Sequence, residues 1–161
     1  MRWIPSGQGS LAGLTVSYEK LNRRLPLSTR MSPNPSPAGP LELELPAVPS
    51  SVATTRHAVA EFCAGQALDH DAVAFAVSEA VANAVVHAYR DGAHGHVRIS
   101  ASLDGGSLLL VIRDDGQGMT PRTDSPGMGV GLAIIASLSC SLEIAGDAGG
   151  TRLTIRFDPL D

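Results

Sequence analysis

Three polar residues, Glu79, Asn83 and His87, recur at four-residue intervals in an otherwise Ala/Val-rich stretch. In a helix this spacing puts them on one stripe. Asparagine is unfavourable in mid-helix because its side chain competes for backbone hydrogen bonds. The Asn83 oxygen could instead bind Mg²⁺, and Glu79 could accept a proton from a water or hydroxyl that attacks a phosphate. The alternative is a half-exposed face with solvated Glu and Asn. His87 is expected to anchor the end of the helix or the following loop.

A second group of residues combines a carboxylate with closely spaced glycines. It comprises Asp114, Gly116, Gly118, Gly127, Gly129, Gly131 and Leu132. Such glycines let the backbone approach a ligand closely, and the helix expected to begin near residue 129 offers unpaired N–H groups to an anion. A carboxylate repels phosphate but accepts a hydrogen bond from an exocyclic amine such as that of adenine. The group therefore predicts a nucleotide pocket.

The lysine content restricts the kind of pocket. The only lysine is Lys20, so neither a P-loop nor a protein-kinase-type fold, each of which needs a lysine at the phosphates, can be built from residues 41–161. Phosphates would have to be held by backbone amides and a metal ion, with an arginine as a further candidate. Arg122, between the two glycine groups, either contacts the γ-phosphate or is a solvated loop arginine.

Composition and charge exclude other classes of function. The chain has 161 residues, of which 43% are hydrophobic, as expected for one globular domain. Residues 41–161 carry seven arginines against fifteen acids, a net charge of −8, which is unfavourable for nucleic-acid binding. No stretch approaches the ~20 apolar residues of a membrane span, and no signal-peptide core is present. A cytoplasmic protein is expected, with Cys63 and Cys140 reduced and buried.

Residues 1–40 differ from the rest of the chain. They carry a net charge of +4 and contain the proline-rich run 32–40, so they are expected to be a disordered or linker-like extension, with a short helix within 11–27. A true start at Met31 is an open alternative. Residues 41–161 are expected to form the domain.

The pattern of residues 41–161 predicts an α+β fold, a two-layer α/β sandwich with helices on one face of a mixed, mostly antiparallel sheet. The expected elements are a strand at 41–45, helices from Ser50 or Ser51 to about 66 and from Asp69 or Asp71 to about 89, strands at 97–103 and 108–113, a helix at 129–138, and strands at 141–145 and 151–157. Gly105 and Gly106 are expected to form a tight hairpin turn.

Taken together, four sequence motifs resemble the boxes of the GHKL ATPase superfamily, which has the Bergerat fold. They are Glu79-x-x-x-Asn83, Asp114-x-Gly116-x-Gly118, Gly127-x-Gly129-x-Gly131-Leu132 and Gly149-Gly150-Thr151. The resemblance covers residues 41 to about 158. The sequence of residues 78–89, SEAVANAVVHAY, is most similar to that of the anti-sigma-factor serine/threonine kinases of bacterial partner switching.

This resemblance implies ATP and Mg²⁺ as cofactors and a role for each motif. Glu79 would be the catalytic base and Asn83 the Mg²⁺ ligand. Asp114 would bind the adenine amino group, with Gly118 alongside the adenine ring, and Thr151 would contact a water bound to adenine. Residues 127–131 would form the helix start that binds the phosphates. The implied function is a kinase that phosphorylates an anti-sigma antagonist protein and sequesters a sigma factor; a homodimer is left open. Only eight residues, 119–126, separate the two glycine boxes, so the alternative is an ATP-gated protein-binding regulator with little turnover.

Overall fold

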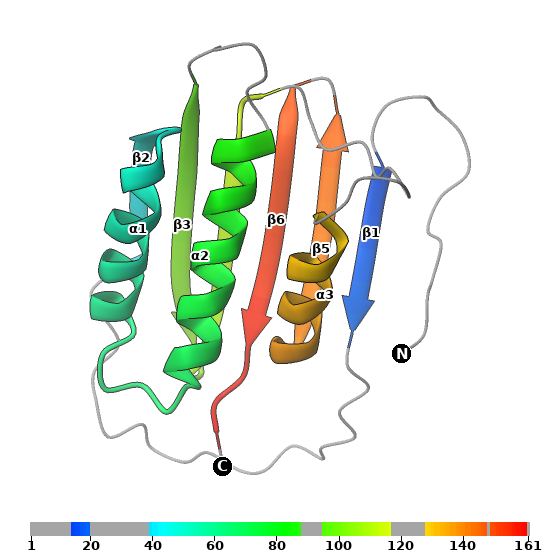
Figure 1. The fold of residues 1–161 in the computed structure, drawn as a ribbon. Coiled ribbons are helices and arrows are strands. Elements are labelled where there is room, and N and C mark those ends of the chain that lie inside the picture. The colour runs from blue at the N-terminus through cyan, green and yellow to red at the C-terminus, as the bar shows by residue number, and fades with distance from the viewer. Residues whose placement is uncertain (1–13, 20–38, 88–94, 117–127, 148, 161) are drawn as a thin grey trace.

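The computed structural model of the protein describes residues 14–19, 39–87, 95–116, 128–147 and 149–160. Six strands and three helices make up this part of the chain (Figure 1). In chain order they are β1 (Leu14–Glu19), β2 (Leu41–Pro46), α1 (Pro49–Phe62), α2 (His70–His87), β3 (His96–Asp104), β4 (Ser107–Asp114), α3 (Met128–Leu138), β5 (Ser141–Asp147) and β6 (Gly150–Phe157).

The strands form one sheet in the order β1-β5-β6-β4-β3-β2, and all three helices cover the same face (Figure 1). The predicted two-layer α+β sandwich is therefore confirmed. The prediction of a mixed sheet is wrong, because each of the five strand pairings in the described part of the chain is antiparallel. The strands β4 and β5, joined by α3, run in the same direction, but β6 lies between them and pairs with both.

The N-terminal segment departs from its prediction. The expected helix within 11–27 is wrong, because residues 14–19 form the edge strand β1, paired antiparallel to β5 from Leu14 opposite Gly146 to Glu19 opposite Ser141. The sequence Leu-Thr-Val-Ser-Tyr-Glu is rich in β-branched and aromatic residues, and the edge of β5 offers unpaired backbone groups for a further strand. Part of the segment expected to be a linker thus extends the sheet. Met31 and the run 32–38 lie outside the described residues.

Local signals explain most element boundaries. The helix α1 begins at Pro49, just before the expected Ser50 or Ser51, and no side chain caps it. The Ser51 hydroxyl donates to the Pro46 carbonyl instead (2.7 Å). The helix α2 begins after Asp69, one of the two residues expected at its start, and the Asp69 Oδ1 caps it by accepting the Ala72 N–H (3.0 Å). The β3–β4 hairpin turns at Gly105 and Gly106, both with positive φ (57° and 85°).

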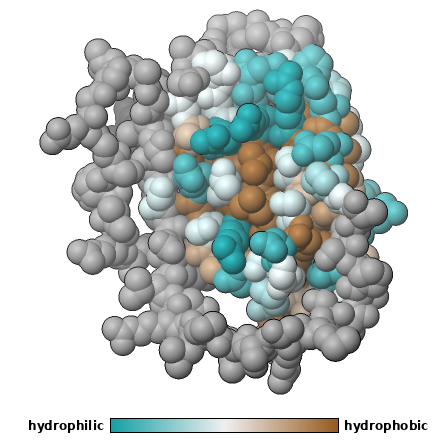
Figure 2. All heavy atoms as spheres, turned by 180° about the vertical axis from the view of Figure 1, so that it is seen from behind, coloured by the Kyte–Doolittle hydropathy of each residue, from teal (hydrophilic) through white to brown (hydrophobic). Residues whose placement is uncertain are grey.

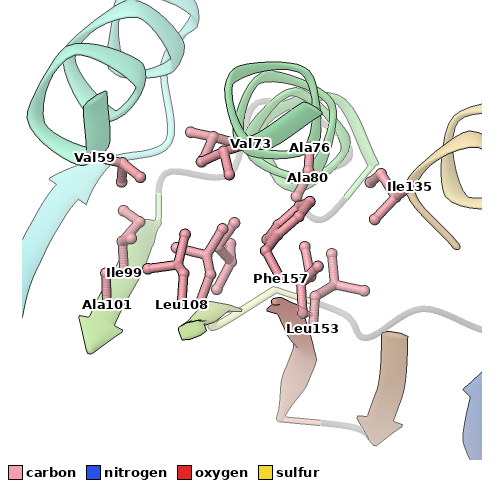
Figure 3. Packing of buried hydrophobic residues seen from close by; sticks show 14 of the residues in the cluster. Val59, Val73, Ala76, Ala80, Ile99, Ala101, Leu108, Ile135, Leu153 and Phe157 are labelled. Carbon is pink, nitrogen blue, oxygen red and sulfur yellow. The ribbon is translucent and has the colours of Figure 1, made fainter. Parts of the chain in front are cut away.

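The core lies between the helices and the sheet. Figure 3 shows Ala76 and Ala80 of α2 facing Phe157 of β6, with Ile135 of α3 beside them. Alanines on the inner side of α2 let the helix lie close to the sheet, where larger side chains from the strands fill the space. The helix that carries the polar stripe is therefore fixed at the centre of the molecule. Of the two cysteines, Cys63 is buried as predicted, whereas Cys140 is half-exposed and donates to the Asp158 carboxylate.

Candidate functional site

The carboxylate of Asp114 lies at the end of β4 and binds two backbone amides. Its Oδ1 accepts the N–H of Gly116 (3.0 Å), two residues later, and that of Thr151 (3.2 Å) on the neighbouring strand β6. Burial raises the pKa of Asp114 above its ordinary value, while these hydrogen bonds oppose the rise. The structure thus brings together Asp114, Gly116 and Thr151, three of the residues predicted for the site.

Gly150, for which no role in the site was predicted, makes this contact sterically allowed. The φ of Gly150 is +127°, and a Cβ there would lie 2.9 Å from the carbonyl carbon of Asp114 and 3.2 Å from the Cα of Asp115. A side chain at 150 would therefore push β6 away from the end of β4. In the sequence, the signal for this residue is the Gly149-Gly150 pair before Thr151, which indicates a motif but does not reveal the packing requirement.

The polar stripe on α2 meets the start of α3 at Gly131. A Cβ at this glycine would overlap the Glu79 carboxylate and lie 2.7 Å from the Cγ of Glu79. Gly131 is buried and Glu79 is half-buried. The glycine group and the helix stripe, 52 residues apart in sequence, are therefore parts of one site, and Gly131 has a packing role that the sequence did not predict.

Asn83 lies one turn of α2 beyond Glu79, and only 8% of it is exposed. Its amide nitrogen, Nδ2, is buried and has no hydrogen-bond partner among the described residues. An unsatisfied buried polar group costs about 1–3 kcal/mol, and native proteins rarely keep one without a reason. The alternative of a solvated asparagine is therefore wrong; a polar side chain is held in the interior beside Glu79, with spare hydrogen-bonding capacity.

The remaining predicted site residues are placed less completely. His87 ends α2 and Gly129 lies in the first turn of α3, while Leu132 packs against the core. Gly118 and Gly127, at the facing ends of the two glycine motifs, and Arg122 between them lie outside the described residues. The site roles given to these six residues stay predictions.

A metal ion at this site would need ligands from the protein. Among the described residues, no group of three or more His, Cys, Asp or Glu side chains could hold one. An ion such as Mg²⁺, which keeps several waters and is shared with substrate phosphates, needs only one or two protein oxygens. The side-chain oxygen of the buried Asn83 is a ligand of the required kind, whereas the atom left without a partner is its nitrogen Nδ2, which can donate a hydrogen bond but cannot bind a cation. None of the helices in the described part of the chain has the length and apolar character to cross a membrane.

Comparison of the domain with known protein families identifies the family to which it belongs. The family model described as histidine kinase-like ATPase domain matches residues 45–157, well over half of the chain. The protein belongs to this family. The match contains the α2 stripe, the end of β4 and the β5–β6 hairpin that together form the candidate site.

Within that family, the chain is similar to anti-sigma F factors. The anti-sigma F factor of Clostridium kluyveri is 31% identical over 93 residues, which cover 50% of this chain and 65% of that protein. The anti-sigma F factor of Bacillus subtilis is 46% identical over 44 residues, which cover 27% of this chain and 30% of that protein. The chain thus matches less than two thirds of the length of either relative.

Solved structures agree with the fold. The crystal structure of the RsbU and RsbW domains of Rv1364c from Mycobacterium tuberculosis is similar, with a TM-score of 0.61 and 29% identity over 76% of this chain and 33% of that chain. The histidine kinase domain of a blue-light activated kinase from Erythrobacter litoralis shares the fold, with a TM-score of 0.51 and 23% identity over 71% of this chain and 62% of that chain.

Proposed function

We propose that this protein binds ATP with Mg²⁺ and is an anti-sigma-factor serine/threonine kinase of the bacterial cytoplasm, which phosphorylates an antagonist protein and sequesters a sigma factor. Membership of an ATPase domain family and similarity to anti-sigma F factors support the proposal. The observation that carries it is the buried, incompletely bonded Asn83 one helical turn from Glu79, which packs against Gly131.

The adenine end of the site is assigned to Asp114. Its Oδ1 already accepts two backbone N–H groups, and the remaining carboxylate oxygen can accept the exocyclic amine of adenine. The Thr151 hydroxyl would contact a water on the base, and Gly116 and Gly118 would let the backbone lie alongside it. A carboxylate held by two amides keeps one orientation, which favours a ligand with a fixed donor.

The phosphate end is assigned to Asn83 and the start of α3. The amide oxygen of Asn83 would hold Mg²⁺, which neutralises phosphate charge when it is bound. Backbone N–H groups at 127–131, at the positive end of the α3 dipole, would bind phosphate oxygens in place of the missing lysine. Arg122 would supply a further positive charge, and His87 would steady the end of α2.

Glu79 is assigned as the base. In the transfer, the serine oxygen of the antagonist forms a bond to the γ-phosphorus, the bond to the β–γ bridging oxygen breaks, and ADP leaves. Glu79 takes the hydroxyl proton. The contact with Gly131 restricts the Glu79 side chain, so its carboxylate is positioned before substrate arrives.

The second candidate is a nucleotide-gated regulator that binds partners without significant phosphoryl transfer. The eight residues 119–126 between the glycine motifs are the observation in its favour, because a short segment covers little of a bound nucleotide. Retention of a base beside the site favours the kinase, since a protein that only binds ATP does not need Glu79.

The deciding experiment is transfer of label from [γ-³²P]ATP to an antagonist protein encoded beside this one. Wild type should label a serine, Glu79→Gln should keep ATP binding but lose label by at least a hundredfold, and Glu61→Gln, an exposed acid on α1, should behave as wild type. Unlabelled antagonist together with ATP-dependent complex formation would assign the protein to the second candidate.

A further inference from the structure

The face of the sheet opposite the helices carries a row of arginines. Arg98 on β3 lies directly opposite Arg113 on β4, and Arg113 lies directly opposite Arg152 on β6. All three are exposed and alternate along their strands with buried residues of the core side. Figure 2 shows this face, where hydrophilic residues gather across the upper part above an apolar patch.

This arrangement has an electrostatic cost that is only partly compensated. Like charges directly opposite one another on paired strands are destabilising. Arg98 has a partner, because its Nη2 lies 3.0 Å from Oε1 of Glu44 on β2. Neither Arg113 nor Arg152 forms an ion pair with any residue in the described part of the chain. In a domain where acids outnumber arginines by fifteen to seven, two adjacent arginines without an ion pair among the described residues are unexpected.

The two arginines border a hollow of about 310 Å³. Besides them it is lined by small residues, Ala145, Gly146, Gly149 and Gly150, and by Asp114 and Thr151. None of the described lining residues belongs to a helix. The small lining residues leave room for a ligand beside the guanidinium groups. Carboxylates also lie nearby: Asp114 lines the hollow and accepts two backbone amides through Oδ1, and Asp115 accepts the His96 N–H (2.9 Å). Glu143 lies two residues along β5 from Ala145, which is opposite Arg152.

We propose that this hollow is a second anion site, which binds a phosphate group through Arg113 and Arg152. Two uncompensated guanidinium groups match the charge of a phosphate monoester, which is close to −2 at neutral pH, better than that of a single carboxylate. The site is separate from the phosphate end of the proposed ATP site, which lies on the helix side at Asn83 and α3. It shares Asp114, Thr151 and the Gly149-Gly150 pair with the proposed adenine end.

The test is a titration of the full-length protein with inorganic phosphate, followed by ¹H–¹⁵N NMR. The amides of Ala145, Gly146 and Gly149 and the Nε–H groups of Arg113 and Arg152 should shift. Arg113→Gln or Arg152→Gln should weaken phosphate binding at least tenfold. Arg56→Gln, which removes an exposed charge from α1, should leave it unchanged. Arg113→Lys keeps the charge and tests whether any loss comes from misfolding.

Comparison of ligands identifies the source of the phosphate group. O-phosphoserine bound more tightly than inorganic phosphate would indicate a phosphorylated side chain, and equal affinities would indicate free phosphate; both support the site. The proposal is overturned if shifts are confined to the amides of α3, if Arg56→Gln weakens binding as much as Arg113→Gln, or if acetate binds as tightly as phosphate.

Discussion

The side chain of Glu79 occupies the space that a Cβ atom at residue 131 would need. The glycine in α3 is therefore the complement of the carboxylate on α2, and the two helices fit together only because one position lacks a side chain. This relationship connects the packing of the molecule with the residue proposed as the base, and it can be measured.

Gly131→Ala should displace the Glu79 carboxylate. Alanine in a helix is favoured over glycine by about 0.5–1 kcal/mol, so the free energy of unfolding should change little while phosphoryl transfer falls more than tenfold. In a Glu79→Ala background the clash is absent, and the same substitution should stabilise the protein by about 0.5–1 kcal/mol. Denaturant unfolding of the four proteins measures the coupling. Equal effects of Gly131→Ala in both backgrounds would show that the two residues do not constrain each other.

Asn83→Leu should separate stability from binding. Leucine removes the buried unsatisfied amide, so the free energy of unfolding without ligand should rise by about 1–3 kcal/mol. Mg²⁺-dependent ATP binding, measured by calorimetry, should be lost. Ser78→Ala, a neighbouring change in α2 that removes a hydroxyl bonded within its own helix, should leave binding unaffected. A destabilised Asn83→Leu protein would indicate that the amide is satisfied in the native state.

Asp114→Asn should weaken ATP binding by about 1–3 kcal/mol, or roughly 5- to 150-fold, because a buried acceptor for the adenine amine is impaired. Asp115→Asn, the same change at the exposed neighbour, is the control and should retain wild-type affinity. Calorimetry of both variants with ATP and with GTP distinguishes a contact to the base from a general effect of charge. Equal losses for the two variants would remove Asp114 from the adenine site.

The raised pKa of Asp114 also predicts a pH dependence. The Asp114 carboxyl group keeps its proton to a higher pH in the folded state than in the unfolded state. The free energy of unfolding of the wild type should therefore fall as the pH rises from the ordinary pKa of 3.8 through the raised pKa of the folded state. Above that window the cost of the buried charge is constant. Asp114→Asn should lack this fall, so the difference between the two pH–stability curves isolates it. Parallel curves would mean that the carboxyl group is solvated when folded.

The two cysteines should react at different rates. Burial raises the pKa of Cys63 to about 11, which keeps its thiol protonated and inaccessible, whereas Cys140 is half-exposed. Iodoacetamide should modify Cys140 first in the native protein, and Cys63 only at the rate of unfolding. Mass spectrometry of tryptic peptides over time gives both rates. Similar native rates for the two would contradict the burial of Cys63.

A chain that begins at Met31 should still bind ATP. It lacks β1, which pairs only with β5 at the edge of the sheet, and Asp114 and Thr151 lie on β4 and β6, beyond β5. Calorimetry should show an affinity within about twofold of wild type. Hydrogen exchange at β5 amides should become faster because they lose their partners. Loss of nucleotide binding would show that residues 1–30 support the site.

Much of this architecture could be predicted from local patterns. The period of residues 70–87 indicated the helix with Glu79 and Asn83 on one stripe, and Gly105-Gly106 indicated the hairpin. The strand β1 was not predicted because a segment of six residues carries a weak signal, and its pairing depends on the edge of β5, more than 120 residues later. Such pairing is visible only once the sheet is assembled.

The site was predicted as residue types but not as contacts. Spacing identified Asp114 and Thr151 as candidates, yet their hydrogen bond depends on β6 lying beside β4 and on the absence of a Cβ at Gly150. The fit between Glu79 and Gly131 likewise depends on how α3 packs against α2. These are properties of tertiary packing, which a periodicity of one helix or strand does not contain.

The insertion of β6 between β4 and β5 has a consequence for synthesis on the ribosome. Until residues 150–157 have emerged, β4 has an open edge and Asp114 lacks the Thr151 amide, although α2, β3 and β4 are already available to fold. A nascent chain would therefore gain no stability from ATP until nearly all of the sheet had left the exit tunnel. Ligand binding can rescue the finished domain from unfolding, but it cannot guide the early steps by which that domain is made.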